Sequence, residues 1–163
     1  AVVTGREWSA AAPVPGGEAR GLRWLCLATT LAIYLQIGFG VILTHTGRRL
    51  DAHLLVAGVV SLLVPLAARR ALALPVAPLG RSARLLRWLW MAQLLLGLLA
   101  YAARFHAGEV ALGPAAGLGV ALAHRLVGAL MLAASVALTV LAYRTAAPVP
   151  AFGPAPAGER VPA

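Results

Sequence analysis

The sequence contains no lysine, only one cysteine and only five acidic residues among its 163 positions. A single thiol, Cys26, cannot form an internal disulfide, and it argues against a zinc or iron–sulfur centre built on cysteines. The apolar runs contain no acidic side chain, so a transporter would lack the groups that usually relay protons or cations. A phosphate-binding glycine loop with lysine and a serine triad are also missing, which disfavours the common soluble-enzyme classes.

What the sequence does contain is hydrophobic residues, which make up 61% of the chain and give a mean hydropathy of +0.84. Four apolar runs occupy residues 24–44, 52–68, 88–103 and 126–143, and the last can begin as early as Ala115. Crossing a bilayer takes roughly 20 residues, and arginines at the ends of the shorter runs can reach the headgroups. The sequence therefore predicts an all-α integral membrane four-helix bundle with up-down topology. The alternative is that these runs are buried helices of a soluble protein. The small number of polar positions argues against it.

Segments rich in proline, glycine and alanine flank the apolar region. Residues 1–20 include Pro13, Pro15, Gly16 and Gly17, and residues 147–163 contain five prolines. Such a composition argues against regular structure. We therefore expect flexible tails at 1–20 and 147–163, on either side of a transmembrane four-helix domain at 21–146.

All 14 basic residues are arginines, and the formal net charge is +9. They lie between apolar runs rather than along one polar stripe, which argues against nucleic-acid binding and favours contact with membrane lipid. In a four-span topology the two tails and the middle loop share one side with ten arginines, and the other side has four. The positive-inside rule then predicts a multi-pass protein of a bacterial-type inner membrane, with both termini in the cytoplasm.

The same polar residues recur in the same order in both halves of the chain. They are Gln36, Gly40, His45 and His53 in the first half, and Gln93, Gly97, His106 and His124 in the second. Each half contains two spans, so duplicated halves would have the same orientation and a pseudo-two-fold axis along the membrane normal. We therefore expect two pseudo-symmetric two-helix repeats.

His53 and His124 occupy equivalent positions near the start of the second and fourth spans. In an up-down bundle these two spans are diagonal, so both imidazoles point to the centre from opposite sides, toward the outer face of the membrane. Polar residues inside membrane spans are costly and tend to be functional. The pair predicts one haem b per chain, with His53 and His124 as the iron ligands. An interfacial polar role is the alternative.

Other residues near the outer face are further candidates for haem contact. Arg125 follows His124 directly, and we expect it to pair with a haem propionate. Weaker candidates, for which contact with lipid headgroups or a helix end is the alternative, are His45, His106, Arg48 and Arg49. Gln36 and Gln93 are expected to form hydrogen bonds between helices.

Two stretches of the chain resemble the haem A synthase family, which is involved in cytochrome oxidase assembly. They are Leu-Gln-Ile-Gly at 35–38, followed by His-Thr-Gly at 45–47, and His-Arg-Leu-Val-Gly at 124–128. Residues 24–144 are similar to one of the two four-helix halves of that family, and the resemblance implies haem ligation at His53 and His124. The synthases carry a glutamate one turn before the first histidine and often paired cysteines in an outer loop. Here Leu50 stands three residues before His53, and the outer loops have no cysteine.

Three functions follow from these patterns. The first is an electron-transfer subunit of a larger respiratory or redox membrane complex, because two axial ligands leave no open site on iron for oxygen chemistry. Its partners would be other subunits, a quinone or a cytochrome, and it would have no catalysis of its own. The alternatives are a half-size, haem A synthase-like assembly factor acting as a dimer, and a haem-free structural accessory subunit.

Overall fold

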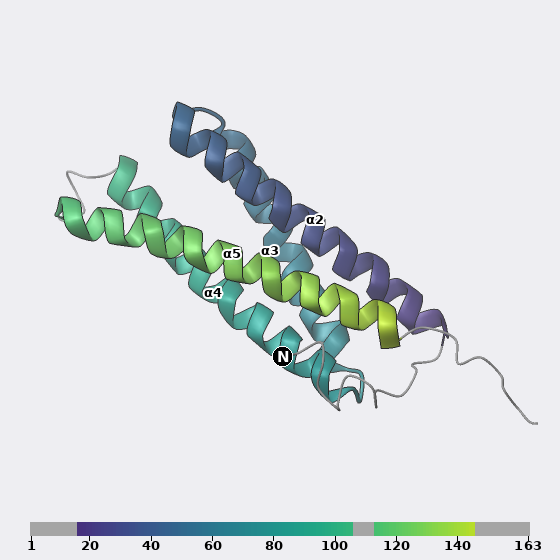
Figure 1. The fold of residues 1–163 in the computed structure, drawn as a ribbon. Coiled ribbons are helices and arrows are strands. Elements are labelled where there is room, and N and C mark those ends of the chain that lie inside the picture. The colour runs from purple at the N-terminus through teal and green to yellow at the C-terminus, as the bar shows by residue number, and fades with distance from the viewer. Residues whose placement is uncertain (1–15, 106–112, 146–163) are drawn as a thin grey trace, which may run out of the picture.

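The computed structural model describes residues 16–105 and 113–145, which form four helices (Figure 1). They are α2 (Gly16–Thr46), α3 (Leu50–Leu72), α4 (Ala77–Phe105) and α5 (Pro114–Thr145). All four are long and apolar enough to cross a membrane. This confirms the prediction of an all-α protein with four candidate membrane-spanning helices.

Each helix is longer than the apolar run that predicted it. Helix α4 differs most, because it begins at Ala77 and includes three arginines before the apolar run starts at residue 88. Arginine is a good helix former, and its long side chain can leave the apolar layer without ending the helix. The prediction of a tail through residue 20 is wrong for residues 16–20, which form the start of α2. Gly16 and Gly17 are tolerated there because glycine is one of the residues accepted at the N-terminal cap of a helix. The predicted tail at 147–163 lies outside the described residues.

The helices form a closed ring of four contacts. Each packs against its neighbours in the sequence, and α2 completes the ring by packing against α5. Helices α3 and α5 therefore occupy diagonal corners. The hydroxyls of Thr30 and Thr139 are 2.9 Å apart between α2 and α5, and Trp90 Nε1 donates to Ser61 Oγ at 3.4 Å between α4 and α3. Such bonds between membrane helices contribute about 0.6 kcal/mol each.

A three-residue turn connects α2 to α3. Gly47 (φ 67°) and Arg49 (φ 68°) both adopt the left-handed conformation. Glycine does so without strain, whereas a residue with a Cβ loses roughly 1–2 kcal/mol. The Arg48 backbone N–H donates to the Thr46 hydroxyl at 3.1 Å, which helps to hold the reversal.

The buried core occupies only one half of the bundle. It consists of the N-terminal part of α2, the C-terminal part of α3, the start of α4 and the C-terminal part of α5; its largest members include Leu22, Val64, Leu79, Leu86, Leu138 and Leu141. In the other half, made of the described residues 34–59, 87–105 and 113–127, no residue is buried. Figure 1 shows the α2–α3 pair diverging from the α4–α5 pair toward that end. Side chains therefore fill one half of the interior much more completely than the other.

Large apolar side chains cover the outside of the helices. Leu55, Leu62, Leu95 and Leu98 are each more than two-thirds exposed, at 72, 75, 71 and 68%. An exposed apolar surface of this extent is unfavourable in water and favourable against lipid chains. The surface therefore agrees with the span lengths in indicating a multi-pass membrane protein.

Candidate histidine site

His53 lies in the first turn of α3 and packs against α2. Its Nε2 atom is 3.2 Å from the amide nitrogen of Gln36. Gly40, one turn further along α2, lies against the same ring, because a Cβ added there would be 3.3 Å from His53 Cε1. The glycine thus allows the imidazole to approach the α2 backbone closely.

His124 has the same surroundings in the second half of the chain. Its Nε2 atom, on α5, is 3.3 Å from the amide nitrogen of Gln93 on α4. A Cβ at Gly97, one turn after Gln93, would be 3.1 Å from His124 Cε1. Gly128 makes room for the glutamine, since a Cβ there would be 3.2 Å from its amide nitrogen. Gln36 and Gln93 therefore link helices, as expected, and the structure adds that a histidine is the partner in both cases.

Each histidine–glutamine pair leaves two buried polar atoms without a hydrogen-bond partner. They are the histidine Nδ1 and the glutamine Oε1, at His53 and Gln36 and again at His124 and Gln93. A buried polar group that lacks a partner costs roughly 1–3 kcal/mol. Turning the amide by 180° would let Nε2–H donate to the glutamine oxygen, yet Nδ1 would still be unpaired. Both arrangements therefore leave one ring nitrogen on each histidine that requires an additional partner.

The two imidazoles belong to one region of the molecule. They lie on the diagonal helices α3 and α5, in the half of the bundle without buried residues. The described residues contain no group of three or more histidine, cysteine or acidic side chains that could hold a metal ion. An ion held there by the two histidines would need its remaining ligands from another source, such as the four nitrogens of a porphyrin.

The arginines predicted to contact a propionate all lie at the histidine end. Arg48 and Arg49 are exposed in the α2–α3 turn, and Arg125 is exposed on α5. The sequence did not single out Arg104, whose Nη2 atom is 3.9 Å from the Cβ position of Gly47 and so brings the end of α4 beside that turn. The sequence could have indicated Arg104 as a further candidate, because it ends the third apolar run on the same side as Arg48, Arg49 and Arg125.

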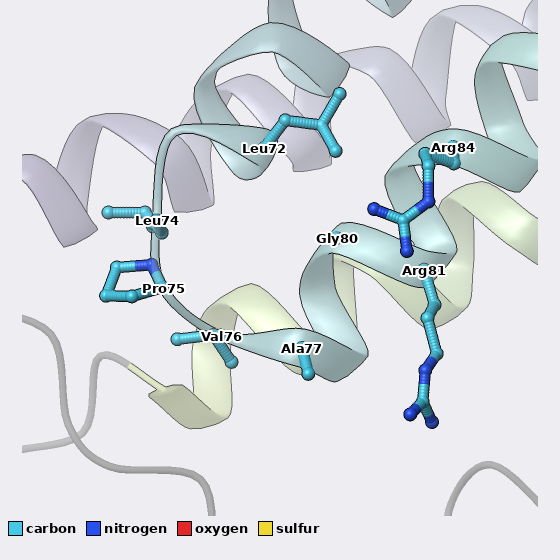
Figure 2. A pocket seen from close by; sticks show the side chains of 8 residues that line it. All are labelled: Leu72, Leu74, Pro75, Val76, Ala77, Gly80, Arg81 and Arg84. Carbon is cyan, nitrogen blue, oxygen red and sulfur yellow. The ribbon is translucent and has the colours of Figure 1, made fainter.

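His45, one of the two remaining histidine candidates, is not brought into the site. His45 is exposed in the last turn of α2. His106 lies outside the described residues. A hollow at the opposite end of the bundle, in the α3–α4 turn, shares no lining residue with the histidine site (Figure 2).

No protein family, curated protein or solved structure was found to match the chain. Fold alone does not identify function in a four-helix bundle, which serves many unrelated activities. Function therefore has to be inferred from the chemistry of the histidine site.

Proposed function

We propose that the chain is a membrane b-type haem protein whose single haem iron is bound by His53 and His124. It would transfer electrons as a subunit of a larger respiratory or redox membrane complex. The observation that supports this most directly is the repeated arrangement on two diagonal helices. On each, an imidazole is held by a glutamine of the preceding helix and keeps one buried nitrogen without a partner.

Gln36 and Gln93 can each supply the hydrogen-bond acceptor that an iron-binding histidine requires for its second ring nitrogen. A histidine bound to iron offers one nitrogen to the metal and donates the other N–H to an acceptor, which fixes the tautomer and the ring orientation. Amide oxygen and nitrogen exchange places by a simple flip. With the oxygens of Gln36 and Gln93 accepting from Nε2–H, the lone pairs of His53 Nδ1 and His124 Nδ1 remain for the iron.

The packing of the histidine half also suits a bound macrocycle. No described residue is buried there, and Gly40 and Gly97 keep the backbone close to the imidazole rings. The haem would supply one-electron oxidation and reduction, and two imidazole ligands favour that role over oxygen chemistry. Arg125, Arg48 and Arg49 are placed to pair with the propionates at the exposed end.

The proposal includes an orientation in the membrane. The helices would run up and down as two pseudo-symmetric hairpins, with both termini and the α3–α4 turn in the cytoplasm of a bacterial-type cell. Arginines are more numerous at the α3–α4 end than at the histidine end, which supports this direction. The haem would then lie toward the outer face, where another subunit, a quinone or a cytochrome can exchange electrons with it.

A haem-free accessory subunit is the second candidate. The specific observation in its favour is that the glutamine–histidine contacts link α2 to α3 and α4 to α5 without any cofactor. Under this alternative the histidines stabilise helix packing only. The half-size, haem A synthase-like assembly factor has the sequence resemblance as its support.

A visible spectrum of the purified membrane protein, with a pyridine haemochrome assay, tests the proposal. We expect one haem b per chain and the electron paramagnetic resonance signal of low-spin iron with two imidazole ligands. Folded helical protein without haem, prepared from cells with ample haem supply, would establish the accessory role instead. Haem A formed in the expressing membrane would indicate the synthase-like alternative.

Replacing Gln93 with leucine is expected to weaken haem binding by roughly 10–100-fold, the usual effect of removing the partner of a ligating histidine. Haem dissociation, followed by transfer to an acceptor protein, measures the change. Thr30→Val is the matched control, because it removes an interhelical hydrogen bond in the other half of the bundle. Equal haem retention in both variants would show that Gln93 does not support the ligand.

A further inference from the structure

A hollow of about 460 Å³ lies at the α3–α4 turn, at the end of the bundle opposite the histidines (Figure 2). One side of it is apolar and is formed by Leu72, Leu74 and Val76. The other side is the first part of α4 and includes Gly80 and Arg84. The hollow thus combines an apolar wall with a cationic group at the boundary of the apolar helices.

Arg84 is directed at this hollow. Its Nη1 atom is 3.5 Å from the position that a Gly80 Cβ would occupy, and Leu72 Cδ2 is 3.8 Å from the same position. Gly80 therefore lies between the guanidinium and the apolar wall. Figure 2 shows the Arg84 guanidinium turned back toward Gly80, and Arg81 also lines the hollow.

The charge around the hollow is almost entirely positive. Arg69 and Arg70 lie in the last turn of α3, and Arg87 follows Arg84 by one turn. Residues 52–105 contain no acidic side chain. Of the two acids in the described part of the chain, Asp51 is at the far end of α3 and Glu18 is on α2, which does not line the hollow.

We propose that this hollow binds the phosphate headgroup of an anionic phospholipid such as phosphatidylglycerol. Basic pockets between membrane helices recognise anionic headgroups, and a guanidinium matches phosphate geometry with two parallel hydrogen bonds. Arg84 pairs with the phosphate, and the first methylenes of the acyl chains lie against Leu72 and Leu74. The apolar wall is the reason for assigning a lipid rather than a free anion, which would gain nothing from it.

Binding of phosphatidylglycerol to the full chain in detergent, measured by native mass spectrometry, tests this assignment. Arg84→Gln is expected to weaken binding about five-fold, the effect of one arginine at a headgroup. Arg87→Gln, one turn away and outside the lining, should change it by less than half as much. Circular dichroism of both variants verifies that the helices are intact.

Three outcomes would overturn the assignment. An equal loss in Arg84→Gln and Arg87→Gln would mean that the arginines act only as a diffuse charge. Phosphatidylcholine binding as tightly as phosphatidylglycerol would remove the need for a cationic site. Inorganic phosphate displacing the lipid at an equal concentration would identify a site for free anions. None of these results depends on whether haem is bound at the other end.

Discussion

Replacing His53 or His124 with alanine is expected to remove nearly all bound haem while the helical bundle stays folded. The haem would lose one of the two histidines proposed to hold it, and the effect should exceed the roughly 10–100-fold loss expected on removing the hydrogen-bond partner of such a histidine. The buried core is in the other half of the bundle, so the fold does not depend on either imidazole. The ratio of haem to protein after purification, from the pyridine haemochrome assay, measures the loss.

His45→Ala provides the control for these variants. His45 lies at the same end of the bundle as His53 and His124, but it is exposed in the last turn of α2 and should be dispensable. We expect its haem content to equal that of the unmodified chain. Normal haem content and an unchanged low-spin signal in His53→Ala would refute bis-histidine ligation by this pair.

Introducing valine at Gly40 or Gly97 is expected to displace the neighbouring imidazole. A Cβ alone would be 3.3 Å from His53 Cε1 or 3.1 Å from His124 Cε1, and the additional methyl groups increase the overlap. Overpacking of this kind usually costs about 1–3 kcal/mol. We expect a lower unfolding temperature together with loss of the low-spin haem signal, and the tighter contact at Gly97 should give the larger effect.

The chain offers a control two residues from Gly40. Gly38 lies on the same helix, and a Cβ there would have no neighbour within 4 Å. Gly38→Val carries the same cost of a β-branched residue in a helix without touching a histidine. If Gly38→Val and Gly40→Val reduced haem binding equally, the effect would come from helix propensity and the close approach of His53 would have no functional meaning.

The hydropathy of the chain was sufficient to predict its four long apolar helices. Burial in lipid demands long apolar runs, and short connections favour contact between successive helices. Helix ends were less predictable, because arginines such as Arg81 and Arg84 continue a helix beyond its apolar part. Hydropathy predicts which residues of a helix suit the apolar layer of a membrane, but it does not predict the residue at which the helix ends.

The partners of the histidines could be predicted only in part. Gln36 and Gln93 recur at matching places, which indicated a shared role, but a side-chain hydrogen bond depends on the rotation and register of two helices. The uneven core was also not predictable from composition, because alanine and leucine taken together are equally frequent in the two halves of a helix such as α5. The helices lie closer together at one end of the bundle because their side chains interlock better there. Amino-acid composition alone does not predict such interlocking.

The one-sided core has a mechanical consequence. Residues such as Leu79, Leu86 and Leu138 pack the four helices together at one end, whereas side chains fill the opposite end less completely. Under the proposed function, haem would enter sideways from the lipid at that less packed end, after the chain has been inserted into the membrane. The uneven packing would therefore favour binding of haem to the folded, inserted protein over folding of the chain around haem.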